Sequence, residues 1–121
     1  MDRTILVEKY LDTWNEIDAN KRQAMLAELW TEHGTYTDPM ADITGIDQVA
    51  ALISKFQEQL PGVYLKRTGD VETHHNLARF TWDLLTPTGG VVARGMDVAV
   101  FSEDHRFESV LGFFDQAPEL E

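Results

Sequence analysis

The chain contains no cysteine among its 121 residues. This absence excludes a disulfide framework, a thiol nucleophile and a zinc–thiolate site. Positive charge is also scarce, because ten Lys and Arg stand against 21 Asp and Glu and give a formal net charge of −11 at pH 7. A surface that binds nucleic acid or an anionic membrane needs clustered basic residues, and here they are scattered. We therefore expect neither partner.

Long hydrophobic runs are missing as well. No apolar stretch approaches the roughly 18 residues of a membrane-spanning helix, and Met1-Asp2-Arg3 does not open a secretory signal peptide. We therefore expect a cytoplasmic protein. The chain lacks linker-like and low-complexity stretches apart from a short acidic tail at residues 115–121. Its length suits one domain of about 100–150 residues, so we predict a single domain over residues 1–121.

Two kinds of periodicity divide the chain. Apolar residues recur at helical spacing in the first half, and we predict helices at about 4–17, 21–30 and 45–60, with a short strand at 34–37. The second half predicts strands at 63–73, 77–86, 91–102 and 107–115, joined by short turns that favour antiparallel pairing. The predicted fold class is α+β, with three N-terminal helices packed on one face of a curved antiparallel sheet.

Both faces of this predicted sheet are apolar. In the strand at 91–102, alternation places Ala93, Asp97 and Ala99 on one face and Val98 and Val100 on the other. The last strand is similar, with Phe107, Leu111 and Phe113 on one side and Val110, Gly112 and Phe114 on the other. Helices cover only one face of a single sheet. We therefore predict a homodimer that forms through the other face.

Three polar residues stand in apolar surroundings and are candidates for chemistry. Asp97 lies among alanines, and a lone ionised carboxylate there must be protonated, paired or directed into a cavity. Asp38 follows Tyr36 at strand spacing, so both side chains point the same way. Tyr10 lies four residues before Trp14 on the inward stripe of the first helix, and a buried tyrosine hydroxyl needs a hydrogen-bond partner.

Each of these residues also has a purely structural interpretation. An aspartate before a proline, such as Asp38, is most often a turn residue bonded to its own backbone. Asp97 could pair with Arg79 or Arg67, and Tyr10 could be a core residue whose hydroxyl reaches the surface. Convergence of all three on one apolar cavity would favour the functional interpretation instead.

The order of these elements resembles a known superfamily. The resemblance is carried by Tyr10 in VEKYLDTWNEID, Asp38 in GTYTDPM, Gly45-Ile46 at the start of the third helix, and Asp97 in VVARGMDVAVF. Over about residues 5–114 the chain resembles nuclear transport factor 2-like proteins, and within them SnoaL-like proteins and ketosteroid isomerases. The resemblance implies a cone-shaped cystatin-like roll, with an apolar ligand pocket between sheet and helices, and usually a dimer. It implies no cofactor.

The same resemblance implies a role for each polar residue. Tyr10 matches the tyrosine that donates a hydrogen bond to the substrate carbonyl, and Asp38 matches the general base that moves a proton beside that carbonyl. Asp97 matches the aspartic acid that stays neutral and donates to the same oxygen. Six aromatic residues are candidates for the wall of an apolar ligand pocket: Trp14, Trp30, Tyr36, Phe80, Trp82 and Phe114.

The sequence leaves other functions open. Ile53 stands near the position where isomerases carry a supporting tyrosine. This replacement would leave Tyr10 with fewer hydrogen-bond partners. Limonene-epoxide hydrolases carry an arginine two residues before the aspartate, where this chain has Gly95. SnoaL-like cyclases use an aspartate for an intramolecular aldol closure, and these residues do not separate that reaction from isomerisation. A non-catalytic ligand-binding or dimerisation module is a further alternative. The four histidines are placed poorly for a metal site, so we expect none.

Overall fold

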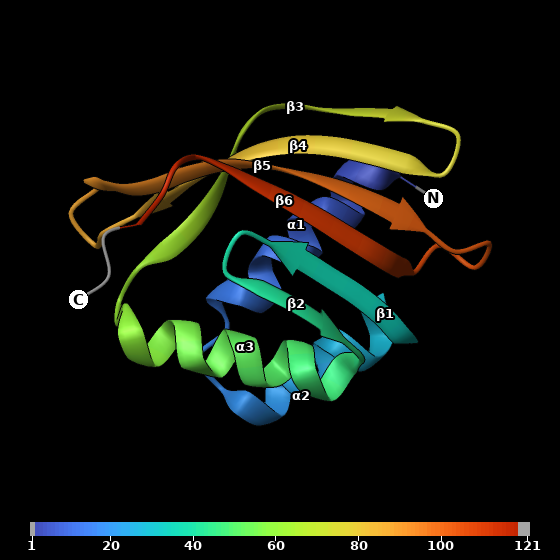
Figure 1. Ribbon diagram of the computed structural model, residues 1–121, viewed down its shortest axis with the longest axis horizontal. Coiled ribbons are helices and arrows are strands. Elements are labelled where there is room, and N and C mark those ends of the chain that lie inside the picture. The colour runs from blue at the N-terminus through green and yellow to red at the C-terminus, as the bar shows by residue number, and fades with distance from the viewer. Residues whose placement is uncertain (1, 119–121) are drawn as a thin grey trace.

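The computed structural model describes residues 2–118, which form three helices and one six-stranded sheet. The elements follow in the order α1 (Arg3–Asn15), α2 (Ala19–Leu29), β1 (Trp30–Asp38), β2 (Ala41–Thr44), α3 (Ile46–Gln59), β3 (Tyr64–His74), β4 (Leu77–Leu85), β5 (Val91–Phe101) and β6 (Phe107–Gln116). The three helices lie on the same side of a curved, open sheet (Figure 1). The predicted α+β cone is confirmed. Residues 119–121 of the predicted acidic tail lie outside the described residues.

Side-chain caps decide where the first two helices begin. The Asp2 carboxylate accepts the backbone N–H of Thr4 at 2.8 Å, and Asp18 accepts the N–H groups of Asn20 and Lys21. Such caps satisfy backbone donors that the first turn leaves without partners. The α1 helix ends at Asn15, and Ile17, predicted to extend its inner stripe, is 86% exposed. That extension of the helix was wrong.

The sheet has the strand order β2-β1-β6-β5-β4-β3. Neighbouring strands of the second half pair antiparallel as predicted, whereas β1 runs parallel to β6. The predicted strand at 34–37 is longer in the structure, and β2, which follows a tight turn, was not predicted. Together β1 and β2 extend the concave face beyond β6, so the sheet curves around the helices (Figure 1).

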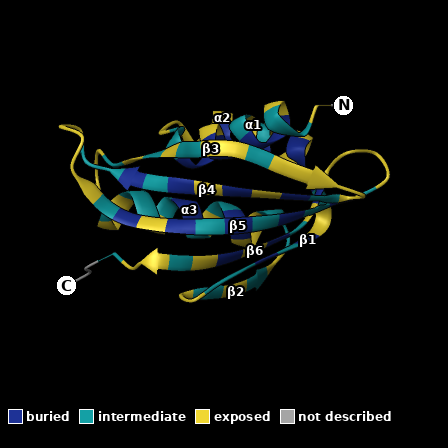
Figure 2. Ribbon diagram, turned by 90° about the horizontal axis from the view of Figure 1, so that it is seen from above, coloured by how far each residue is buried: buried dark blue, intermediate teal, exposed yellow. Residues whose placement is uncertain are grey.

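Burial alternates along the central strands (Figure 2). On β4 and β5 the residues that face the helices are buried, and they include Phe80, Ala93 and Ala99. An irregular register at the start of β6 places Phe107 on the buried face together with Val110. The prediction that Phe107 shares a face with Leu111 and Phe113 was wrong, because strict alternation fails where the register shifts.

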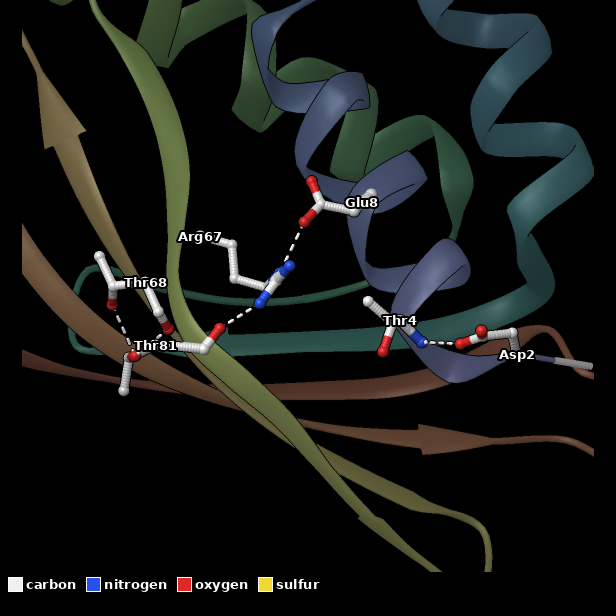
Figure 3. A network of polar contacts seen from close by, with 7 residues as sticks. Asp2, Thr4, Glu8, Arg67, Thr68 and Thr81 are labelled. Atoms are coloured by element: carbon white, nitrogen blue, oxygen red, sulfur yellow. Dashed lines mark hydrogen bonds and ion pairs between the residues drawn. The ribbon is translucent and has the colours of Figure 1, made fainter.

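The first helix is held to the sheet by polar contacts on both sides of Tyr10. Arg67 on β3 donates to Glu8 on α1 at 2.6 Å and also to the carbonyl of Gly69 (Figure 3). Further along, Asn15 exchanges two hydrogen bonds with the backbone of Leu65. These contacts fix α1 against β3 and so determine where the Tyr10 side chain lies.

A buried arginine closes the other end of α1. Arg22, 3% exposed, donates to the carbonyl of Glu16 at 2.7 Å and to the side chains of Ser54 and Gln57. Gln57 in turn donates to the carbonyls of Trp14 and Glu16. A cation beside a helix C-terminus satisfies carbonyls that the helix itself leaves without donors. The contact therefore joins α1, α2 and α3 on the helical side of the sheet.

None of the helices within residues 2–118 is both long enough and apolar enough to cross a membrane.

Candidate active site

A cavity lies between the concave face of the sheet and the helices α1 and α3. Its volume is about 190 Å³. Most of its wall is hydrocarbon or aromatic, and the described residues that line it are Tyr10, Trp14, Tyr36, Asp38, Met40, Leu52, Lys55, Phe56, Gln59, Leu60, Leu65, Trp82, Leu84, Ala93, Asp97, Phe114 and Pro118. All three candidate catalytic residues are in this wall. The structure thus brings together side chains from α1, β1 and β5 that are far apart in the sequence.

Strand register places the two carboxyl groups on either side of a glycine. Asp97 on β5 pairs directly with Gly112 on β6, and Thr37, the residue before Asp38, pairs with Leu111 on the same strand. A Cβ atom at position 112 would lie 2.6 Å from Asp97 Oδ1 and 3.5 Å from the Cβ of Asp38. The missing side chain of Gly112 therefore leaves the space that the Asp97 carboxyl group occupies and opens the sheet surface between the two acids.

Asp97 is buried without a cation. Its exposure is 4%, and it makes no ion pair within the described residues. The two arginines considered as partners are engaged elsewhere, Arg67 with Glu8 and Arg79 with Glu72. Burial raises the pKa of Asp97 from 3.8 to about 7, the negative charge of Asp38 adds to the rise, and a hydrogen bond from the Trp82 indole opposes it. The group is therefore neutral in a large fraction of molecules near neutral pH.

Asp38 has a different environment. The Tyr36 hydroxyl donates to its Oδ2 at 2.6 Å, and the backbone N–H of Met40 donates to its Oδ1 at 2.7 Å. The second contact is the turn interaction expected of an aspartate before a proline, and it coexists with a place in the cavity wall. These two donors hold the Asp38 carboxyl group in one orientation at the cavity wall.

Tyr10 projects from α1 into the same space. It is 2% exposed, and its pKa is raised well above 10.0, first by burial and then by the negative charge of Asp97. The phenol therefore keeps its proton and can act as a hydrogen-bond donor. Its ring packs against Phe107 at 5.2 Å and Phe80 at 5.9 Å between centroids, which fixes the direction of the hydroxyl.

The six predicted aromatic wall residues divide into two groups. Four line the cavity, and among them the rings of Trp14 and Tyr36 are 5.6 Å apart, as measured between centroids. Trp82 and Phe114 also line it, with their rings edge to face and 5.9 Å apart between centroids. The other two, Trp30 and Phe80, are each 1% exposed, do not line the cavity and belong to the core. These four wall rings give an interior suited to a flat apolar ligand.

Several residues at the cavity were not predicted from the sequence. Met40 reaches the wall from the turn between β1 and β2, and Lys55 and Gln59 reach it from α3. Only the helical spacing of Lys55 and Gln59, four residues apart on one face, could have suggested that they act together. Nothing in the local sequence indicates that this face of α3 borders a cavity.

Two departures from the resembling families have clear structural consequences. Ile53 is fully buried, so a hydrocarbon side chain stands where isomerases carry their supporting tyrosine. Arg94 points to the outer face and lies 3.4 Å from Asp83, so it does not reach Asp97. The arginine–aspartate pair that the limonene-epoxide hydrolases use is therefore missing from this face of β5.

A family model and a solved structure both relate the chain to SnoaL-like proteins. A family model described as the SnoaL-like domain matches residues 7–110. The crystal structure of a candidate isomerase of the SnoaL-like family from Agrobacterium tumefaciens is 33% identical in sequence. The two structures superpose with a TM-score of 0.89 over 93% of this chain and 96% of that chain. No curated protein matches the chain significantly.

More distant structures share the fold. A nuclear transport factor 2-like protein of unknown function from Exiguobacterium sp. 255-15 has a TM-score of 0.74 at 15% identity, covering 93% of this chain and 99% of that chain. A candidate SnoaL-like polyketide cyclase from Jannaschia sp. CCS1 has a TM-score of 0.70 at 16% identity, covering 93% of this chain and 86% of that chain. At these identities the likeness concerns the fold alone.

Proposed function

The chain belongs to the SnoaL-like family, and we propose that it is an enzyme that moves a proton beside a carbonyl group of an apolar small molecule. In this proposal Asp38 is the general base, and Tyr10 and Asp97 donate hydrogen bonds to the carbonyl oxygen. Fold alone does not select this activity, because one fold hosts many functions. The proposal therefore depends on the chemistry of the cavity.

The observation that carries the proposal is the contrast between the two carboxyl groups. Asp97 is buried without a cation, and its raised pKa of about 7 keeps it protonated in much of the population. Asp38, on the other side of Gly112, accepts hydrogen bonds from Tyr36 and Met40 as a carboxylate does. A buried acid with a raised pKa, beside a second carboxyl group that two donors hold in place, is an arrangement typical of acid–base catalysis.

The proposed reaction conserves all atoms. The Asp38 carboxylate takes a proton from the carbon between the carbonyl group and a carbon–carbon double bond, and the electron pair passes to the carbonyl oxygen. Tyr10 and Asp97 stabilise the resulting dienolate through hydrogen bonds, which are strong in an interior of low polarity. Asp38 then returns the proton to the far end of the former double bond. The product is the conjugated isomer, and no cofactor takes part.

We also propose that the protein is a homodimer. On the outer face of the sheet Met96 pairs across the strands with Phe113, and Val98 pairs with Leu111. Phe113 is 61% exposed and Leu111 is 40% exposed in the single chain. Apolar side chains gathered on a face opposite to the helices are typical of a surface that a second copy covers.

Conversion of cyclohex-3-enone into cyclohex-2-enone tests the proposed reaction, because the conjugated product absorbs in the ultraviolet. We expect the wild type to catalyse it and Asp38→Asn to lose about 10²–10⁴-fold in rate, the typical contribution of a positioned base. Asp42→Asn, an exposed aspartate that bonds Thr37 and does not line the cavity, is the matched control and should keep full activity.

A binding experiment with 4-propylphenol shows whether a variant has lost the catalytic step or has lost ligand binding. This phenol presents a hydroxyl group where the substrate oxygen would lie. Asp38→Asn should still bind this phenol. A protein that binds it but never converts unsaturated ketones would be a non-catalytic binding module, and the proposed activity would be wrong.

A further inference from the structure

The cavity has a second polar region, formed by residues other than those used in the proposed reaction. Lys55 and Gln59 lie four residues apart on α3 and both line the cavity. Both are exposed, as is Met40, another lining residue, whereas Tyr10 and Asp97 are 2% and 4% exposed. The exposed residues mark the mouth of the cavity and the buried ones mark its inner end. Most of the remaining wall is apolar, and Leu52 and Phe56 on α3 contribute to it.

The polar groups at the mouth have no partners among residues 2–118. Lys55 makes neither an ion pair nor a side-chain hydrogen bond there, and Gln59 makes no side-chain hydrogen bond. Of the described residues that line the cavity, Lys55 is the only cation, in a chain whose net charge is −11. An ammonium and an amide on one helix face together suit an anionic acceptor such as a carboxylate.

The volume of the cavity limits the ligand further. A buried apolar cavity of about 150 Å³ holds one benzene ring. This cavity has a volume of about 190 Å³ and therefore encloses a single ring with a short side chain, or two small fused rings. A four-ring skeleton exceeds this volume, and part of it would project out of the mouth.

From these observations we infer that the substrate is a one-ring or two-ring carbonyl compound with a carboxylate at the end opposite the carbonyl. The carbonyl lies at the inner end beside Tyr10 and Asp97, the ring fills the apolar middle, and the carboxylate reaches Lys55 and Gln59 at the mouth. This inference rests on the proposed function, because that function assigns the carbonyl to the inner end.

Titration calorimetry with two matched phenols tests the inference. The ligand 3-(4-hydroxyphenyl)propanoate has the ring and chain length of 4-propylphenol, with a carboxylate in place of the terminal methyl group. We expect the wild type to bind the acid about two- to fivefold more tightly, which is the upper part of the range for an exposed ion pair. Lys55→Met should abolish this preference and leave the affinity for 4-propylphenol unchanged. Lys21→Met, which removes the same charge from an exposed position on α2 outside the cavity wall, should preserve it.

The outcomes separate this inference from the proposed function. Equal affinity of the wild type for both phenols, or a preference that survives Lys55→Met, overturns the inference and leaves the proposed reaction standing. Tighter binding of a four-ring phenol than of 4-propylphenol overturns the size limit and with it the substrate class. If neither one-ring phenol binds, the proposed function fails together with this inference.

Discussion

The carboxyl group of Asp97 lies over Gly112, its direct partner on the neighbouring strand, at a point where no side chain fits. A Cβ atom at position 112 would approach Asp97 Oδ1 to 2.6 Å, closer than real Cβ contacts come. The same glycine separates Asp97 from Asp38, whose Cβ would be 3.5 Å from that added atom. One missing side chain thus creates the place where two carboxyl groups border one cavity.

Substitution of Gly112 tests this relationship. Gly112→Ala should lower kcat/KM by about 100-fold, because a displacement of about 1 Å in a catalytic group has an effect of that size. The cost in folding free energy should be about 1–3 kcal/mol, as for other overpacked sites. Enzyme kinetics and urea unfolding measure the two effects. Gly90→Ala, whose added Cβ would meet only the Thr86 side chain, is the control and should change neither. Unchanged kinetics in Gly112→Ala would contradict the assigned role of the glycine.

The pH dependence of the reaction follows from Asp97. If its acid form donates to the substrate oxygen, kcat/KM of the wild type should fall about tenfold per pH unit above the pKa of about 7. Asp97→Asn keeps an N–H donor but cannot titrate, so its maximal rate should fall while the decline near pH 7 disappears. A profile of kcat/KM from about pH 5 to about pH 9 shows either result. A decline near pH 7 that persists in Asp97→Asn would assign it to another group.

The same carboxyl group should reduce the stability of the protein as pH rises. Its pKa is raised by folding, so the folded state binds the proton more tightly, and stability falls between about pH 4 and about pH 7. From pH 5 to pH 8 the wild type should lose roughly 3 kcal/mol of unfolding free energy relative to Asp97→Asn, at about 1.4 kcal/mol per pKa unit. Urea unfolding at both pH values measures this difference, with Asp42→Asn as control. If the unfolding free energies of the wild type and Asp97→Asn change equally between the two pH values, Asp97 does not have a raised pKa in the folded protein.

The outer face of the sheet gives a prediction about assembly. Phe113→Glu places a charge among the apolar residues of that face and should convert a homodimer into a folded monomer. Light scattering coupled to size exclusion measures the mass, and circular dichroism checks the fold. Ile5→Glu makes the same kind of change at a residue on α1 that is 53% exposed, and the dimer should survive it. A wild-type protein that is monomeric at all concentrations would rule out the proposed dimer.

Much of the fold could be predicted from the sequence because its signals are local. Helical spacing located α1, α2 and α3, and alternation located the four strands of the second half. The parallel pairing of β1 with β6 joins segments far apart in the chain, and no local pattern encodes it. The irregular register at Phe107 was missed for a related reason, since it depends on how β6 lies against β5.

The polar residues of the candidate site could be predicted from the sequence, but the rest of its wall could not. Tyr10, Asp38 and Asp97 stood out because polar side chains in apolar surroundings need an explanation, and all three line one cavity. Composition did not reveal which aromatic residues line the wall, because Trp30 and Phe80 resemble the lining residues in type and lie in the core instead. The place of Gly112 between two acids depends on the pairing of three strands, and the sequence carries no direct sign of it.

Deuterium exchange tests the central claim most directly, because it detects removal of the proton without requiring the natural substrate. The measurement uses proton NMR in D₂O. It follows the loss of the signal from the hydrogens on the carbon beside the carbonyl group of a small cyclic ketone. The account predicts exchange well above the buffer rate with the wild type, and exchange at the buffer rate with Asp38→Asn that still binds 4-propylphenol. Exchange that continues undiminished in Asp38→Asn, or that the wild type never accelerates, would contradict it.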